Sequence, residues 1–314
     1  MIAFLFPGQG AQGAGFLHAL GGPLPHPVIA ETFTEASDVL ARDVSRLDDA
    51  GALRSTVAVQ IALLVAGVAA TRALCAEGIG PDAVAGLSVG AYGAAVACGS
   101  IAFDDALRLV QLRAQLMEQA YPSGYGMLAV VGLNEREIGR AISESGAKAY
   151  IGNLNAPRQI VVSGSDSALE RVRQRVIASG ARKAERLTVN VPSHCELLDD
   201  AAQQLIAAAA KIGFAAPRIP YIGNRGARVL RTAETVRDDL ATNLRYPVRW
   251  HDATVVLREL GVRVMVEMPP GHTLSQLAAE ALCEGSPIAA IAVEQSSIGD
   301  AAARIRAECT RNAD

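Results

Sequence analysis

The sequence predicts an α/β protein with a parallel sheet and a smaller unit inserted into it, on two observations. Short β-like runs alternate with helical patterns, and this alternation favours a parallel sheet covered by helices on both faces. The rhythm then changes between residues 126 and 188, where strands and helices follow a different order. A chain of 314 residues, half of them hydrophobic, is long enough to bury a core for both parts.

The larger part is predicted from the segments on either side of the insertion. Three strands are expected at Ile2–Phe6, Ala83–Leu87 and Val262–Met268, and three helices around Ser55–Glu77, Phe103–Ala120 and Glu196–Lys211. In open α/β sheets, functional sites gather in the loops at the carboxyl ends of the strands. The turns after the first two strands are therefore the places to search for chemistry.

The inserted unit has a strand-helix-strand-strand-helix-strand order. Its expected elements are, in order, Met127–Val131, Glu135–Glu144, Ala149–Asn153, Gln159–Ser163, Ser167–Ala178 and Arg182–Leu187, with a central turn at residues 155–158. This order is typical of a ferredoxin-like unit. We therefore expect a ferredoxin-like subdomain at residues 126–188, inserted in a catalytic domain formed by residues 1–125 and 189–314.

Charge and hydropathy exclude several classes of function. The net charge is −3 and the pI is about 6.0, and no basic run suggests a nucleic-acid partner. The N-terminal stretch lacks a positive region and is broken by Pro7, so it does not resemble a secretory signal. The longest apolar segment, Val57–Ala70, is too short to span a bilayer and predicts a buried core helix rather than a membrane partner.

Five scattered cysteines, without a CxxC pair, indicate a reduced protein with no disulfide framework and no zinc site. The expected location is therefore the cytoplasm.

The most informative motif is Gly86-Leu87-Ser88-Val89-Gly90, which follows a predicted strand and precedes a run of small residues. In α/β-hydrolase-like folds, G-x-S-x-G places a serine nucleophile on a strained turn between a strand and a helix. We therefore expect the larger domain to be α/β-hydrolase-like, with Ser88 exposed at its sheet edge. The alternative is a chance match in a chain rich in glycine and alanine.

A serine nucleophile needs a base, and the chain has five histidines. Two lie in a Gly/Pro-rich stretch and two at predicted helix starts: His18, His26, His251 and His272. His194 follows the inserted unit and precedes a helix, and such a crossing between domains is suited to a residue that reaches into a cleft. A helix cap is the alternative role for His194.

These pieces together resemble the malonyl-CoA:acyl carrier protein transacylase family over nearly the whole chain. Five of its motifs occur in order: F-P-G-Q-G-x-Q at 6–12, G-x-S-x-G at 86–90, an arginine segment at 109–117, V-P-S-H at 191–194 and P-V-x-W at 247–250. Any one of them alone would be weak, whereas five in order at similar separations form a specific signal.

The resemblance implies a role for each matching residue. Ser88 would be the nucleophile and His194 the base, while Gln9 and the Val89 N–H would form an oxyanion hole. Arg113 would bind the free carboxylate of a malonyl group, which agrees with the match between a guanidinium fork and a carboxylate.

Two further expectations concern the neighbours of these residues. The resemblance implies that a backbone carbonyl at Asn243 orients His194, since no acidic partner for the histidine is evident. Arg108 and Arg113 are five residues apart on one predicted helix and do not share a face, so one is expected to be exposed and the other buried.

The chain departs from the family pattern at five positions. Leu87, Val89 and Ala91 replace the histidine, leucine and glutamate of the usual elbow, Asn243 replaces a glutamine, and His272 replaces a lysine that is often present. The elbow is more similar to that of the transacylase subunit of bacterial malonate decarboxylase, which charges a small carrier protein.

The expected activity is malonyl transfer from malonyl-CoA to the phosphopantetheine-type thiol of an acyl carrier protein, through a malonyl-serine intermediate. No permanently bound cofactor or metal is expected, and malonyl-CoA is the substrate. The partner would be the carrier of fatty-acid synthesis or of malonate decarboxylase. Two alternatives stay open: a serine thioesterase or hydrolase, and a non-catalytic subunit that binds an acyl-CoA or a carrier.

Overall fold

The computed structural model describes residues 1–20, 26–281 and 288–311, so Cys283 lies outside the described residues. Within these ranges the larger part is built on a six-stranded sheet in the order β10-β9-β1-β2-β7-β8. The strands are β1 (Ile2–Phe6), β2 (Ala83–Gly86), β7 (Tyr221–Ile222), β8 (Val229–Leu230), β9 (Val264–Glu267) and β10 (Ala289–Ala292). Neighbouring strands are parallel except for β7 and β8, which are antiparallel.

The sheet is buried on both faces, as expected of a parallel sheet whose crossovers are helices. Along β1, Phe4 and Phe6 enter one apolar cluster, while Ala3 and Leu5 enter the other. The first cluster contains residues of α2 (Pro27–Leu40), α3 (Thr56–Ala76), α4 (Gly90–Ala97), α5 (Phe103–Ala120), α8 (Asp199–Ala209), α9 (Ala233–Thr242) and α12 (Ile298–Arg311). The second contains residues of α10 (Trp250–Glu259) and α11 (Thr273–Ala281). The predicted α/β class with a parallel sheet is confirmed.

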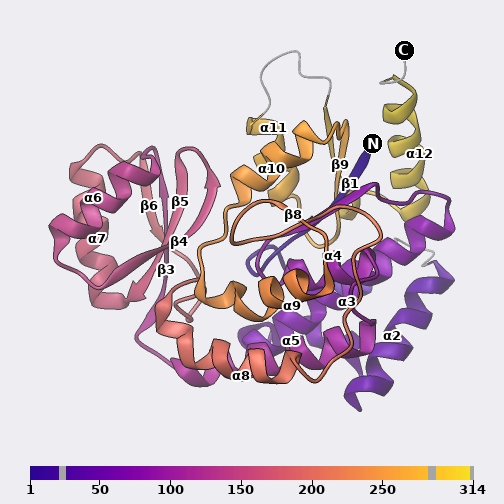
Figure 1. Ribbon diagram of the computed structural model, residues 1–314, viewed down its shortest axis with the longest axis horizontal. Coiled ribbons are helices and arrows are strands. Elements are labelled where there is room, and N and C mark those ends of the chain that lie inside the picture. The colour runs from indigo at the N-terminus through magenta and orange to yellow at the C-terminus, as the bar shows by residue number, and fades with distance from the viewer. Residues whose placement is uncertain (21–25, 282–287, 312–314) are drawn as a thin grey trace.

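The smaller part lies to one side of this sheet (Figure 1) and contains an antiparallel sheet in the order β4-β5-β3-β6. Its elements follow the predicted order: β3 (Tyr125–Val131), α6 (Glu135–Ser145), β4 (Ala149–Ala156), β5 (Gln159–Ser165), α7 (Asp166–Ala178) and β6 (Lys183–Arg186). The two helices pack on one face of the sheet in a separate apolar cluster.

Backbone hydrogen bonds join the smaller sheet to the larger part. The Leu154 N–H donates to the Val248 carbonyl at 2.8 Å, and the Val248 N–H donates to the Gly152 carbonyl at 2.8 Å. This pairing carries β4 alongside the segment that leads into α10, so the two parts are in direct contact.

The structure corrects some boundaries. Strand β4 continues to Ala156, so the predicted four-residue turn shrinks to Pro157 and Arg158. The helix expected from Glu196 begins with a 3₁₀ turn, Glu196–Leu198, and α8 ends at Ala209. Strands β7 and β8, with two residues each, are too short for a recognisable apolar pattern, and β10 is a further strand that was not predicted.

Helix α3, at Thr56–Ala76, agrees with the helix predicted around Ser55–Glu77. It has 21 residues and is long and apolar enough to cross a bilayer, so length alone does not exclude a membrane. Its 18-residue apolar window is 89% buried inside the fold, where it packs against α2 and α5. It is therefore a core helix, as predicted.

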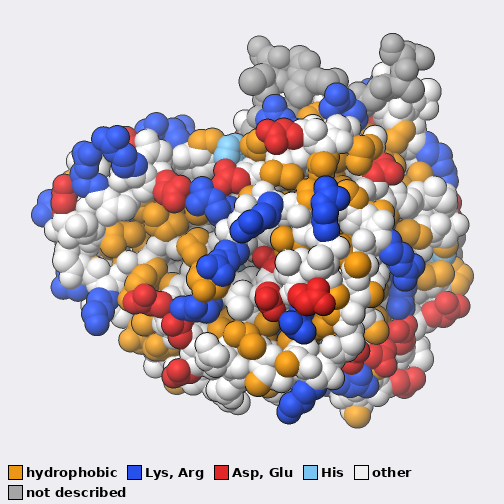
Figure 2. All heavy atoms as spheres, viewed as in Figure 1, with side chains coloured by type: hydrophobic (Ala, Val, Ile, Leu, Met, Phe, Trp, Pro, Cys, Tyr) orange, Lys and Arg blue, Asp and Glu red, His pale blue; other side chains and the backbone are white. Residues whose placement is uncertain are grey.

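Charged side chains of both signs are spread among hydrophobic ones over the face in Figure 2, which suits a net charge near zero. Lys and Arg side chains gather across the middle of this face, where Figure 1 places β8, and Asp and Glu side chains lie below them, over α9. Arg225, Arg228 and Arg231 line a groove there.

Candidate active site

Ser88 lies on a tight turn between β2 and α4. Its φ angle is 58°, in the left-handed region that non-glycine residues rarely adopt. A Cβ at Gly86 would lie 2.2 Å from the Gly90 carbonyl carbon, and one at Gly90 would lie 2.1 Å from the Phe6 carbonyl oxygen. Gly86 is therefore required for the turn to close on α4, and Gly90 for it to pack against β1.

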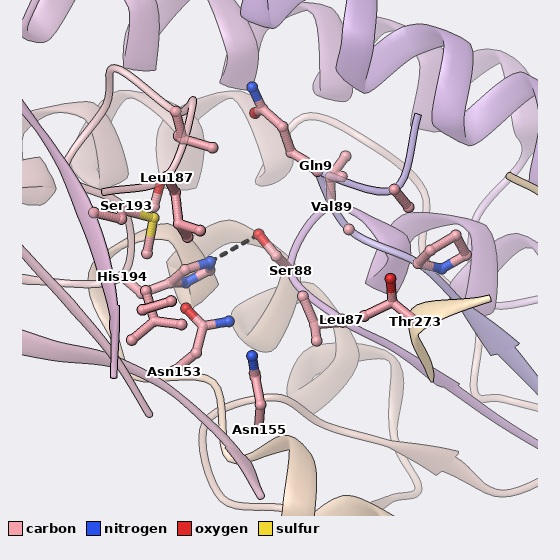
Figure 3. Close-up of a pocket in the computed structure, with 18 of the residues that line it drawn as sticks. Gln9, Leu87, Ser88, Val89, Asn153, Asn155, Leu187, Ser193, His194 and Thr273 are labelled. Carbon is pink, nitrogen blue, oxygen red and sulfur yellow. Dashed lines mark hydrogen bonds between the residues drawn. The ribbon is translucent and has the colours of Figure 1, made fainter. Parts of the chain in front are cut away.

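His194 lies in the segment that returns from the smaller sheet and is 2% exposed. Its Nε2 lies 2.8 Å from Ser88 Oγ, as the dashed line in Figure 3 shows, and its Nδ1 lies 2.7 Å from the Asn243 carbonyl oxygen. A carbonyl only accepts, so Nδ1 carries the proton and Nε2 is free to accept from the serine hydroxyl. This tautomer is the one that general-base activation of Ser88 needs.

The surroundings keep the His194 imidazole neutral. Burial lowers its pKa most, and the positive charge of Arg113 lowers it further, to about 4. The hydrogen bond to the Asn243 carbonyl acts in the opposite direction but is weaker. A neutral imidazole is the form that can take a proton from Ser88.

The other four histidines are not near the serine. His18 is largely exposed and bonds to Asp48, and His26 accepts from the Val28 N–H at the start of α2. His251 lines a separate surface groove beside Arg249, and His272 is exposed before α11. Only His194 reaches Ser88.

Arg113 of α5 is completely buried beneath the serine. Its Nη2 lies 3.1 Å from Ser88 Oγ and 3.3 Å from Asn243 Oδ1, and its Nη1 donates to Gln60 Oε1 at 2.6 Å. Burial lowers its pKa to about 10, so the guanidinium is still charged at neutral pH. Its Nε has no hydrogen-bond partner among the described residues. A charged donor without a carboxylate partner suits an anionic ligand at this position.

Arg108, five residues earlier on the same helix, behaves differently. Its side chain is 55% exposed and lies near Asp104 and Asp105. The expectation that one of these two arginines is exposed and the other buried is confirmed.

Gln9 and Val89 both line the pocket in front of Ser88. Val89 directly precedes α4, so its N–H belongs to the free donors at a helix N-terminus. In Figure 3 the Gln9 side chain extends away from Ser88. The side-chain amide of Gln9 is therefore not directed at the serine, as a donor to an oxyanion there would be.

The pocket lies between the two sheets and has a volume of about 240 Å³. Its walls come from the loop after β1, the elbow, β4 and β5 of the smaller sheet, and the start of α11. The Oδ1 atoms of Asn153 and Asn155 line it and lack a hydrogen-bond partner within the described ranges. No cluster of three or more potential metal ligands occurs among the described residues.

Sequence reasoning missed two residues that touch this arrangement. Gln60 lies inside the apolar segment Val57–Ala70, where no pattern marks it as functional, yet its side chain accepts from Arg113. Asn224 lies in a Gly-Asn-Arg-Gly turn 136 residues after Ser88, and its side chain bonds to the elbow at Gly86 and Ser88. Turn composition predicts a loop there but not which segment the loop contacts.

An α/β fold with a serine on a strained elbow, a neutral histidine bonded to it and a buried arginine beside both has the arrangement of a serine acyl-transfer protein. The sequence profile described as acyl transferase domain matches residues 3–306. The chain belongs to this family.

Individual relatives resemble the chain over most of its length. The malonyl CoA-acyl carrier protein transacylase of Escherichia coli O157:H7 is 38% identical over 304 residues, which is 92% of this chain and 98% of that protein. The protein of the same name from Bacillus subtilis is 34% identical and covers 88% of this chain and 89% of that protein.

Solved structures agree with the fold. The malonyl CoA-acyl carrier protein transacylase of Coxiella burnetii is 36% identical with a TM-score of 0.90, covering 97% of this chain and 96% of that one. A malonyl-transacylase in complex with its type II PKS acyl-carrier protein is 37% identical with a TM-score of 0.90, covering 96% of this chain and 99% of that one.

Proposed function

We propose that this protein is a malonyl-CoA:[acyl carrier protein] S-malonyltransferase. The observation that carries the proposal is the position of Ser88 Oγ, 2.8 Å from His194 Nε2 and 3.1 Å from Arg113 Nη2. The first contact supports activation of the nucleophile, and the second places a buried cation where the free carboxylate of a malonyl group on Ser88 would be held. The transacylase names of the relatives support the same substrate and acceptor.

In the first half-reaction Ser88 Oγ attacks the thioester carbonyl of malonyl-CoA while its proton moves to His194 Nε2. The C–S bond then breaks, and His194 returns the proton to the CoA sulfur as malonyl-Ser88 is left. In the second half-reaction the carrier thiol gives its proton to His194, and its sulfur attacks the malonyl ester. The bond between the acyl carbon and Ser88 Oγ then breaks, which releases the malonyl-carrier thioester, and His194 returns the proton to Ser88 Oγ.

Both half-reactions pass through a tetrahedral oxyanion, which needs donors on the side of Ser88 opposite His194. Val89 N–H and the backbone N–H of Gln9 are the proposed donors. Asn243 orients His194 through its backbone carbonyl, and no permanently bound cofactor takes part in this scheme.

The finer description of the fold is also a proposal. The larger part, residues 1–125 and 189–314, is α/β-hydrolase-like because its nucleophile follows a strand on a G-x-S-x-G turn. The smaller part, residues 126–188, is ferredoxin-like because it has the strand-helix-strand-strand-helix-strand order on an antiparallel sheet. A cytoplasmic location is proposed from the widely spaced cysteines and the buried position of α3.

The residues of the elbow also support a proposal about which carrier protein, and which pathway, this enzyme serves. Leu87 and Ala91 are apolar where the usual family elbow is polar, which favours the transacylase subunit of malonate decarboxylase over fatty-acid synthesis. Transfer to a malonate decarboxylase carrier, measured beside transfer to a fatty-acid carrier, would separate the two.

A test of the function uses intact-mass spectrometry after mixing with malonyl-CoA. The wild type is expected to gain one malonyl group, and Ser88→Ala none. CoA release should be slow after the first turnover without a carrier and fast with one. Full-rate release without a carrier would indicate a hydrolase instead, and an absent adduct on the wild type would indicate a binding subunit.

A further inference from the structure

Two asparagine side chains bind the peptide units on either side of Ser88. On the N-terminal side, Asn224 Oδ1 accepts from the Ser88 N–H at 2.9 Å, and Asn224 Nδ2 donates to the Gly86 carbonyl at 2.9 Å. On the C-terminal side, Asn243 Nδ2 donates to the Ser88 carbonyl at 3.1 Å. Asn224 and Asn243 are 4% and 1% exposed.

These bonds compensate for a backbone conformation that serine does not adopt readily. A residue with a φ of 58° is retained only where the surrounding structure fixes it. The local backbone holds only the carbonyl of Ser88, which accepts from the Ala91 N–H at 3.1 Å. The two carboxamides come from other parts of the chain: Asn224 supplies the bond to the Ser88 N–H, and Asn243 adds a second donor to the carbonyl.

The C-terminal contact also helps to set the direction of the Val89 N–H. The Ser88 carbonyl and the Val89 N–H belong to one planar trans peptide unit, so they point in opposite directions. The Ala91 N–H and Asn243 Nδ2 both donate to this carbonyl at 3.1 Å, so together they fix the N–H that would face an oxyanion.

The N-terminal contact is itself anchored. Asp239 of α9 is 7% exposed, and its carboxylate accepts from the Asn224 N–H at 3.0 Å and from the Tyr221 hydroxyl at 3.1 Å. This carboxylate has no catalytic contact, so its position is explained by holding the loop that carries Asn224.

We propose that the Asn224 and Asn243 side chains are positioning residues for acyl transfer, which hold the nucleophile and the Val89 N–H in register with His194 and Arg113. Asp239 anchors the Asn224 loop. The inference rests on the proposed function, because it concerns the same serine. It adds Asn224, and a second, side-chain role for Asn243, both of which act through Ser88 rather than on the substrate.

The experiment measures single-turnover formation of malonyl-Ser88 and its dependence on malonyl-CoA concentration, in Asn224→Ala and Asn243→Ala. A misplacement of about 1 Å in a reacting group costs about 10²-fold in rate. We expect the maximal acylation rate to fall by about that factor in each variant, with the half-saturating malonyl-CoA concentration changed less than about twofold.

Asn134→Ala is the matched control. Asn134 caps α6 through a capping box, far from the serine, so its loss lowers the melting temperature without touching the elbow. This variant should acylate at the wild-type rate, which separates positioning from a general loss of stability.

Wild-type acylation rates in both variants would overturn the proposal, as would a loss that lies entirely in malonyl-CoA affinity. If Asn224→Ala does not fold, Asn243→Ala decides alone, because it removes only the contact to the Ser88 carbonyl and the one to Arg113. Failure of the proposed function is distinguishable, since the wild type itself would then form no malonyl-Ser88.

Discussion

His194 is the residue whose protonation should set the pH dependence of acylation. Its pKa is lowered to about 4 by burial and by Arg113, so it is a competent base from pH 8 down to about 5. We expect the rate of malonyl-Ser88 formation to be nearly constant over that range and to fall as the pH approaches 4. Stopped mixing followed by intact-mass analysis at each pH measures it.

The same shift predicts a change in stability. Between pH 6.5 and 4 an unfolded histidine, with a pKa near 6.5, binds a proton, whereas the folded His194 does not. The free energy of unfolding therefore falls as the pH drops from 6.5 toward 4. The variant His194→Gln should lose less stability over this window. If the rate of malonyl-Ser88 formation instead fell with a midpoint near pH 6.5, the pKa of His194 would not be lowered as the structure indicates.

Arg113 should decide which acyl group is accepted. Arg113→Ala removes the buried cation, so malonyl transfer should lose about 2–5 kcal/mol of transition-state stabilisation, while acetyl transfer loses much less. The measurement is kcat/KM for both thioesters. Arg108→Ala, on the exposed face of the same helix, should leave both values unchanged. Equal losses for the two acyl groups in Arg113→Ala would refute the role of Arg113.

Among single residues, the sequence predicted most of the proposed site, including Asn243, and missed Gln60 and Asn224, whose side chains support it. The glycines at fixed spacing indicated Ser88, and matches to family motifs predicted Arg113 and His194. Asn224 could not be predicted, because its partner lies 136 residues away and a carboxamide in a turn has no distinctive pattern. The Gln9 backbone became the candidate donor only once the side chain was seen to extend away from Ser88.

Helix α4 packs so closely on β1 that glycine is required on its inner face. A Cβ at Gly93 would lie 2.6 Å from Phe6 Cδ1, whereas nothing lies within 4 Å of a Cβ at Gly139 in α6. Gly93→Ala should therefore lower the free energy of unfolding by about 1–3 kcal/mol through overpacking. Gly139→Ala should raise it by about 0.5–1 kcal/mol, because alanine is the better helix former.

Urea unfolding followed by the fluorescence of Trp250, the single tryptophan, measures both variants. A Gly93→Ala variant as stable as the wild type would show that Phe6 can move aside and that close packing is not needed.

The elements that sequence reasoning recovered best are those with a long, clear signal: the continuous apolar run of α3, the amphipathic period of α5 and the strand-helix order of the smaller part. Strands β7 and β8 have two residues each, and nothing in so short a run signals a strand. Their pairing beside β2 depends on tertiary contacts, and it is this region that delivers Asn224 to the elbow.

For the whole molecule, the order of elements predicted that a smaller unit interrupts the larger one, but not how the two are held together. Part of the answer is Arg186, at the end of β6 where the chain returns. Its Nη1 donates to the Leu187 carbonyl at 2.8 Å and to the Val189 carbonyl at 2.9 Å, and its Nη2 to the Tyr125 carbonyl at 2.6 Å. One guanidinium thus joins the outgoing and the returning segments.

Arg186→Ala removes these bonds and leaves backbone carbonyls of both the outgoing and the returning segment without their charged donor. We expect the free energy of unfolding to fall by about 1.5–3 kcal/mol, the range for hydrogen bonds to a charged group. Since Leu187 and Val189 line the pocket, the KM for malonyl-CoA should rise as well.

Arg186→Lys should restore little, because an ammonium lacks the planar fork that reaches both segments. Arg173→Ala, which removes an exposed arginine paired with Glu170 on α7, is the control and should alter neither property. A lower free energy of unfolding with an unchanged KM would show that Arg186 stabilises the smaller part alone. A lower free energy of unfolding together with a higher KM would show that the segments joined by Arg186 set the shape of the pocket.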